Sequence, residues 1–107
     1  MDIPKKTPLN PVTNVYNFNG KTLPKTSAFV VKIYLKKFDV VEVHALGETI
    51  SKAVRVVEQL QRQHYVTIEK INTFTQKFED NRSKAKLVVT LKVTDDGKKR
   101  VNEEIKQ

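Results

Sequence analysis

The strongest constraint on the fold is a strand, a glycine turn and an amphipathic helix that follow one another between residues 40 and 60. Residues 40–45 alternate apolar side chains with Glu42 and His44, which is typical of a strand with one buried face. Gly47 ends the strand, and Thr49 is a suitable helix cap. The helix that follows has one apolar stripe, formed by Ile50, Ala53, Val54, Val57 and Leu60. Because a strand face and a helix stripe must bury each other, this unit predicts a two-layer α/β domain.

Three further strands are expected around this unit. Residues 15–18 are short and aromatic, which fits an edge strand. Residues 66–78 and 87–93 are rich in β-branched residues, and the polar stretch between them predicts the loop of a long hairpin. The apolar parity of the first of these strands shifts between Ile71 and Phe74, so we expect a bulge or a two-faced region there.

Residues 26–38 fit either a strand or a helix. Their aromatic and β-branched content favours a strand. Helical spacing recurs at Ala28, Val31, Leu35 and Phe38, Pro24 suits a first helical turn, and two lysines suit a helix end. We therefore favour a helix. Its apolar residues lie on several faces and suggest a partner interface, formed by Phe29, Val30, Ile33 and Tyr34. The predicted order is strand, helix, strand, helix, strand, strand, in a mixed sheet with both helices on one face.

Both ends of the chain are polar. Residues 1–14 contain three prolines and little apolar material, which predicts a flexible leader. Residues 15–94 form the predicted domain. Residues 95–107 begin with a turn-forming Asp-Asp-Gly and predict a polar C-terminal tail, either a frayed helix or disordered.

Positive charge is the main functional signal in the composition. The 107 residues include 20 lysines and arginines against 12 acidic residues, a formal charge of +8. The predicted tail has four of each sign, so the excess lies before it. Such an excess attracts polyanions, although ordinary solubility also explains charges of this size. The chain lacks cysteine and an apolar run of membrane-spanning length, and residues 1–10 lack the hydrophobic stretch that is typical of a signal peptide. We expect an intracellular, cytoplasmic or nuclear protein without a membrane partner.

No enzyme signature is present. Gly20, Gly47 and Gly97 are isolated, so no glycine-rich phosphate loop is formed. Neither paired carboxylates nor a nucleophile next to a base stand out. His44 and His64 lack metal-site spacing, and His64 is expected to cap the preceding helix. We therefore expect no catalysis, no cofactor, no metal and no small-molecule substrate.

Residues 41–58 (VEVHALGETISKAVRVVE) resemble the second strand, glycine turn and second helix of the Alba family, and residues 51–54 are the most specific part. Residues 19–21 (NGK) and the closing hairpin follow in family order, so the resemblance covers about residues 15–94. It implies a strand–helix–strand–helix–strand–strand fold that dimerises, with itself or with another Alba-like chain, and binds DNA or RNA.

The resemblance also implies which cations contact the nucleic-acid backbone. In the family these are a lysine after the first strand, basic groups near the glycine turn, and the protruding hairpin. The positions implied in this sequence are Lys21, Lys25, Lys52, Lys77, Arg82, Lys84 and Lys86. For the hairpin cations the alternative is a solvated ribbon whose lysines prevent edge aggregation.

The sequence departs from archaeal family members at the glycine turn. Leu46 and Glu48 stand where archaeal relatives carry arginines, and His44 stands where they have lysine. The Ala-Leu-Gly turn is similar to that of eukaryotic members, which are often linked to RNA, so RNA is slightly favoured over DNA. Phe74 and Phe78 would then either stack on unpaired bases or pack at the hairpin root. The alternative function is a structural subunit of a ribonuclease P-like particle that acts mainly by heterodimerisation.

Overall fold

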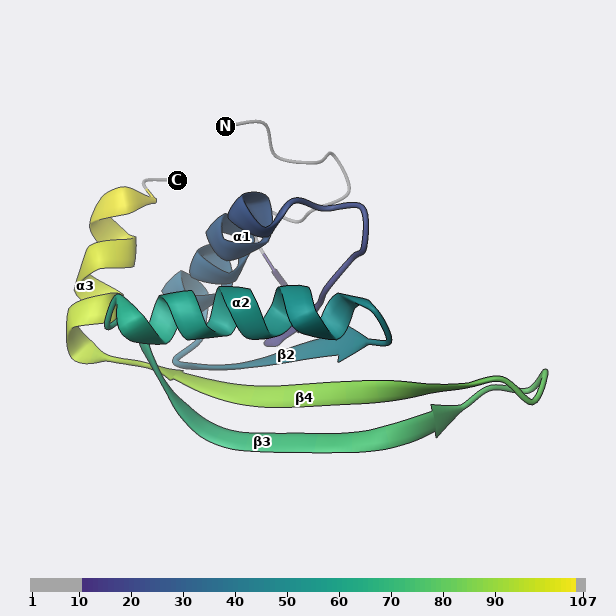
Figure 1. Ribbon diagram of the computed structural model, residues 1–107. Coiled ribbons are helices and arrows are strands. Elements are labelled where there is room, and N and C mark those ends of the chain that lie inside the picture. The colour runs from purple at the N-terminus through teal and green to yellow at the C-terminus, as the bar shows by residue number, and fades with distance from the viewer. Residues whose placement is uncertain (1–10, 106–107) are drawn as a thin grey trace.

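The computed structural model describes residues 11–105, which form a four-stranded sheet with helices on one face (Figure 1). In chain order the elements are β1 (Val15–Asn17), α1 (Pro24–Lys37), β2 (Val40–Leu46), α2 (Thr49–Arg62), β3 (Val66–Lys77), β4 (Ser83–Val93) and α3 (Asp95–Glu104). The predicted fold class and element order are confirmed, and α3 is an additional element.

The strands lie in the order β1-β2-β4-β3, with β1 parallel to β2 and the other pairs antiparallel. β2 pairs with β4 as far as Leu46, opposite Lys86. β3 and β4 continue to pair with each other up to Lys77, opposite Ser83. The end of the hairpin therefore projects beyond the sheet as a two-stranded arm (Figure 1).

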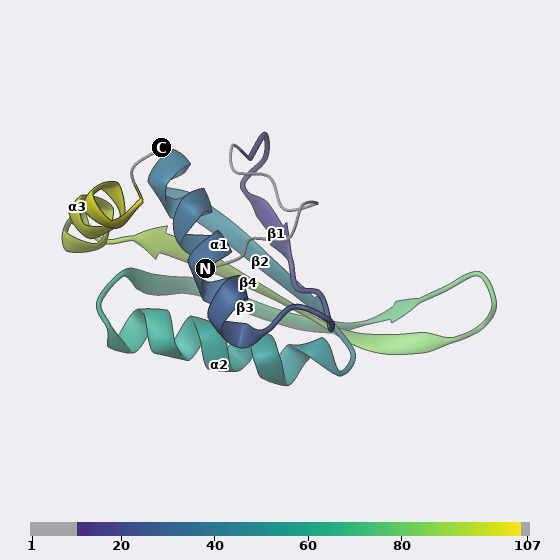
Figure 2. The ribbon, with the colours of Figure 1, turned by 90° about the horizontal axis from the view of Figure 1, so that it is seen from above.

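Strand parity divides the sheet into a covered and an open face. Val41, Val43 and Ala45 of β2 are buried, as are Leu87, Val89 and Leu91 of β4. These side chains pack against α1 and α2, which lie across the sheet (Figure 2). Because side chains alternate along a strand, the intervening residues point to the opposite face, which no described element covers.

α1 is the helix that spacing favours, and it begins at Pro24 as expected. Its strand-like composition has a structural cause, because the helix is buried on several sides by the sheet, α2 and α3. Val30, Ile33 and Tyr34 are at most 7% exposed within the single chain. The prediction of a partner interface is therefore wrong for these three residues, whereas Phe29 is partly exposed and lines a surface groove.

The hairpin differs from its prediction in two respects. Residues 83–86 belong to β4 instead of a loop, since pairing with residues 74–77 satisfies the backbone groups of both strands. The turn is confined to residues 78–82, where the amide of Phe78 donates to the carbonyl of Arg82. The register shift lies between Ile68 and Lys70, and not between Ile71 and Phe74. This bulge brings Ile68 and Ile71 onto the covered face. The second alternative, a two-faced region, holds further along the strand, because Ile71 and Phe74 lie on opposite faces of the regular ladder.

Part of the predicted leader lies against the sheet. Residues 1–10 are outside the described residues. Pro11 is buried, and the carbonyl of Asn14 accepts a hydrogen bond of 2.8 Å from the amide of Glu42 in β2. Residues 11–14 therefore extend the contact that β1 makes with β2.

The C-terminal turn of α2 positions Tyr65 for a contact with α3. His64 has a left-handed backbone with φ of 66°, and its amide donates to the carbonyl of Gln61. The amide of Tyr65 donates to the carbonyl of Leu60, which completes a Schellman motif. His64 therefore ends the helix through its backbone.

The sequence predicts a polar tail after Thr94, whereas the structure continues the domain with α3. The hydroxyl of Thr94 caps this helix by accepting from the amide of Gly97 at 2.8 Å. Val101 and Ile105 are at most 3% exposed, and Val101 belongs to the same core as the strands. Because residues 95–107 contain so few apolar side chains, their contribution to the core could not be seen from the sequence.

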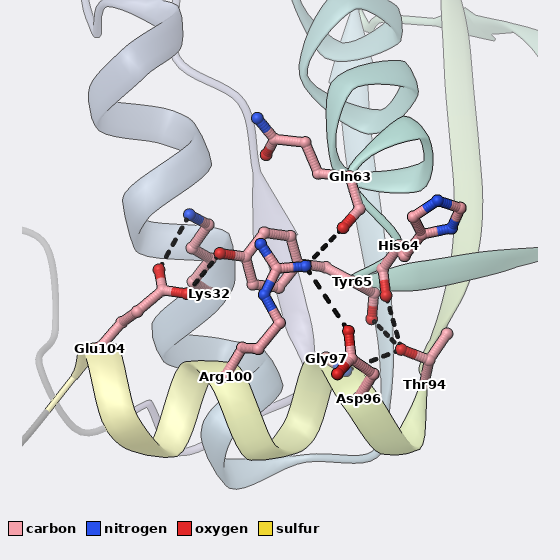
Figure 3. Close-up of polar contacts among 9 residues, drawn as sticks. All are labelled: Lys32, Gln63, His64, Tyr65, Thr94, Asp96, Gly97, Arg100 and Glu104. Carbon is pink, nitrogen blue, oxygen red and sulfur yellow. Dashed lines mark hydrogen bonds and ion pairs between the residues drawn. The ribbon is translucent and has the colours of Figure 1, made fainter.

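A polar network joins α3 to the body around the ring of Tyr65 (Figure 3). Cations from Lys32 and Arg100 lie 4.4 and 4.0 Å from the ring centre. The Tyr65 hydroxyl donates to Glu104 at 2.5 Å. This hydrogen bond is the main reason that the pKa of Glu104 lies below its usual value. Partial burial acts in the opposite direction and raises the pKa, while the nearby cations of Lys32 and Arg100 lower it further. A lowered pKa stabilises the fold above the ordinary pKa of a carboxyl group, and this contribution is lost as pH falls through the folded value.

The close approach of α3 to Tyr65 predicts that a glycine-to-alanine change in this helix lowers the stability of the fold. A Cβ on Gly97 would lie 2.2 Å from the Tyr65 carbonyl oxygen. Glycine-to-alanine changes usually stabilise a helix, yet Gly97→Ala should destabilise the fold by about 1–3 kcal/mol because it overpacks this contact. Thermal unfolding measures the effect, with Lys99→Ala on the exposed side of α3 as control. An unchanged or higher melting temperature for Gly97→Ala would contradict the packing described.

Candidate nucleic-acid interface

Three segments meet at the end of the molecule from which the hairpin projects: the β1–α1 loop, the β2–α2 turn and the root of the β3–β4 arm (Figure 1). The amide of Gly47 donates to the carbonyl of Ala85 at 2.8 Å, which ties the turn to β4. Gly47 has φ of +60°, and a Cβ there would lie 3.3 Å from Cδ of Lys84. Glycine therefore allows both the left-handed turn and the close passage of the Lys84 stem.

Thr49 fixes the β2–α2 turn in a way the sequence does not predict. It is the first residue of α2, and the N-cap is Glu48, which makes no side-chain cap. The Thr49 hydroxyl accepts from the amide of Leu46 at 2.9 Å and donates to the Leu46 carbonyl at 2.8 Å. The predicted cap is thus wrong, and the side chain instead closes the turn.

Lys52 braces the β1–α1 loop. Its ammonium group donates to the carbonyls of Asn19 at 2.9 Å and Gly20 at 3.1 Å, and also to that of Thr22. Since an ammonium has three donors, these carbonyls use all of them. Lys52 is a predicted contact residue, but its geometry is that of a residue that holds the loop carrying Lys21.

The predicted hairpin cations divide between the two sides of the arm. Lys84 and Lys86 have the opposite strand parity to buried Leu87 and therefore lie on the open face. Lys77 pairs with Ser83, which has the parity of Leu87, and therefore lies on the helix side. Arg82 is in the turn, where its Nε lies 2.6 Å from a carboxylate oxygen of Asp80. The ribbon carries the predicted cations, but they do not form one line.

The open face carries two further lysines that the sequence analysis does not single out. Register places Lys92 of β4 and Lys70 of β3 on the same face as Lys84 and Lys86. None of the four forms an ion pair with the described residues 11–105. Among described strand residues that register assigns to this face, Glu42 is the one acid, and it bonds His44 at 3.0 Å. The strand parity of β4 is the signal that could have found Lys92, whereas the face of Lys70 follows from the register of β3 with β4 beyond the bulge.

The remaining predicted cations lie outside this face. Lys21 is exposed in the β1–α1 loop. Lys25 lies near the start of α1 and lines a groove of about 450 Å³ between α1 and α2 together with Lys32. Lys25 therefore stands on the helix side of the domain, away from Lys84 and Lys86.

An apolar groove separates α2 from β3 on the helix side. Its volume is about 240 Å³, and its apolar lining is formed by Val54, Val57, Ile68, Ile71, Leu87 and Val89. Two of these residues, Val54 and Ile71, are 51% and 61% exposed. The groove adjoins β3, which is an edge strand of the sheet.

The described part of the chain contains neither a cluster of metal-ligating side chains nor a long apolar helix. Within residues 11–105, no three His, Asp or Glu side chains are grouped so that they could hold a metal ion. None of the helices described has the length and apolar character needed to cross a bilayer.

The model of the Alba family matches residues 14–78. The chain belongs to the Alba family. Alba proteins generally bind nucleic acids without catalysis and form oligomers. The matched residues contain the glycine turn and the Lys52 brace, whereas β4 and α3 of this Alba chain lie beyond them.

Two solved Alba structures have the same fold. ALBA1 from Trypanosoma brucei is 28% identical, with a TM-score of 0.73, and the similarity covers 85% of this chain and 77% of that one. Alba from Thermoplasma volcanium is 25% identical, with a TM-score of 0.59, over 73% of this chain and 98% of that one. Comparison with curated proteins gives no significant match.

The bracing role of Lys52 can be tested by removing its donors while keeping its stem. Lys52→Met should lower the stability of this Alba domain by about 1–3 kcal/mol and accelerate hydrogen exchange of the amides in residues 19–22, because three carbonyls lose a charged donor. Arg55→Met, an exposed change on the same helix, is the control. Exchange in the loop that stays at the wild-type rate would show that Lys52 does not hold it.

Proposed function

We propose that this protein is a dimeric nucleic-acid-binding protein that contacts the phosphate backbone with little sequence readout and slightly prefers RNA to DNA. The observation that carries the proposal is the concentration of unpaired lysines on the hairpin and the open face. Lys84 and Lys86 belong to a rigid paired strand, and Lys21 stands on a braced loop at the same end. Phosphate oxygens would find these cations already positioned.

Fixed cations bind a polyanion because each neutralised phosphate releases condensed counterions. This contribution is independent of sequence, since phosphates are identical along the strand. The described elements place no helix or loop on the open face that would compete for the lysines. RNA is ranked first because the glycine turn is similar to that of eukaryotic family members.

The proposed dimer uses the groove between α2 and β3, with a second copy of the chain as its occupant. Exposed apolar side chains beside an edge strand are costly for a monomer in water. Alba proteins generally form oligomers, which supports a copy of the same chain or another Alba-like chain as the partner. Two-fold symmetry would then present two basic arms to one nucleic acid.

Neutralising the hairpin tests the phosphate contacts. The triple change Arg82→Gln, Lys84→Gln and Lys86→Gln should weaken binding to every RNA and DNA tested. It should also reduce the salt slope of the affinity by about 2 for single strands and about 3 for duplexes. Filter-binding titrations at two salt concentrations measure both quantities.

The matched control removes the same charge away from the hairpin, through Lys37→Gln at the end of α1, Arg62→Gln at the end of α2 and Lys99→Gln on the exposed side of α3. This variant should keep most of the wild-type affinity. Equal losses in the two triple variants would mean that total charge alone governs binding. An unchanged affinity in the hairpin variant would refute the assignment of the site.

The dimer is tested by placing a charge in the groove. Ile71→Asp should weaken self-association by about 100-fold or more, because it would bury an unpaired carboxylate at the interface. Analytical ultracentrifugation measures this, with Val12→Asp as a control at a residue that is 88% exposed outside the groove. A wild-type chain that is monomeric alone would contradict the homodimer and favour a heterodimer.

A further inference from the structure

The open face of the sheet has a hollow of about 240 Å³ at the root of the hairpin. All four strands or the residues that adjoin them contribute to its lining, which consists of Asn17, Phe18, His44, Ala45, Leu46, Gln76 and Lys86. The hollow therefore combines amide donors and acceptors, an imidazole, apolar surface and one cation.

Phe74 stands next to the hollow with its ring in solvent. It lies directly opposite Lys86 in the β3–β4 ladder, and parity places it on the same face as Gln76, two residues along β3. The Phe74 side chain is 45% exposed. Among the described residues its ring makes no aromatic or cation–π contact. Phe74 is therefore nearly half exposed beside a lysine, without a ring or cation partner among the described residues.

The dimer groove does not account for this exposed ring. That groove is lined by Val54 and Ile71 on the covered side, whereas Phe74 points to the opposite side of the same strand. Packing at the root of the hairpin does not account for it either, since the ring is nearly half exposed. An occupant that brings its own flat apolar face would cover Phe74.

We propose that the open face binds an unpaired nucleotide, whose base stacks on Phe74 while Lys84 and Lys86 bind the flanking phosphates. The inference rests on the proposed nucleic-acid binding and specifies the form of the ligand. An aromatic platform beside a basic strand is how proteins commonly bind single strands. The edge of the base would face the hollow, where Asn17 and Gln76 offer amide groups.

Duplexes cannot use this site in the same way. Bases inside a helix are already stacked on their neighbours and offer only their edges. The lysines attract both forms through their phosphates, whereas Phe74 adds affinity for unpaired bases alone. The site therefore distinguishes single strands from duplexes without reading a fixed sequence.

The test is Phe74→Leu, which keeps an apolar side chain on the strand but removes the stacking surface. The probes are single-stranded RNA of about 12 nucleotides, single-stranded DNA of the same length and an RNA duplex. We expect single-strand affinity to fall about 5-fold or more, with duplex affinity and the salt slope within about twofold of wild type. Phe74→Tyr keeps an aromatic ring and should bind single strands with the affinity of the wild type. Thr73→Ala, on the other face of β3, should also leave this affinity unchanged.

The outcomes separate this inference from the function on which it rests. Equal losses for single strands and duplexes, or no loss for either, would overturn the stacking site while the hairpin neutralisation still tests phosphate binding. Wild-type protein that binds none of the probes would overturn both. A selective loss for RNA and DNA single strands supports stacking on the base, and a loss confined to RNA supports a site that also contacts the ribose.

Discussion

The structure depends on the pairing of β4 with a neighbour on each side. β2 and β3 both hydrogen-bond to this strand, so its alternation is imposed on the whole sheet. Leu87, Val89 and Leu91 fill the core beneath the helices, whereas Lys84, Lys86 and Lys92 have the opposite strand parity and lie on the open face. The same strand that holds the core together therefore presents the cations. A one-residue slip in its register would exchange the two faces.

The end of the molecule near the arm is held by short contacts from α2. Lys52 bonds three carbonyls of the β1–α1 loop, and Thr49 closes the β2–α2 turn through both backbone groups of Leu46. Gly47 lets this turn approach β4. The start of one helix thus fixes the positions of both loops relative to the hairpin. This arrangement gives residues 49–52 a structural role, because Thr49 and Lys52 fix the two loops beside the hairpin.

Most of the fold could be predicted from the sequence because its signals are local. The alternation before Gly47 and the stripe after it lie within about twenty residues, and the closing hairpin has clear strand composition. For residues 95–107 the sequence left a frayed helix and disorder as alternatives, and the packing of α3 into the core could not be predicted, because it depends on contacts with Tyr65 and on two apolar residues in a charged segment. The bulge after Ile68 could not be located either, since it follows from register with β4. For the candidate site, the sequence identified the hairpin cations but not their division between faces.

The central claim is that one face, made of β3, β4 and the adjoining loops, receives the nucleic acid. The most direct measurement is amide chemical-shift mapping of the isotope-labelled protein during titration with single-stranded RNA. The account predicts that the largest shifts fall in residues 72–77, 83–88 and 19–22. Shifts concentrated on α3 and the far ends of α1 and α2, or none at saturating RNA, would contradict it.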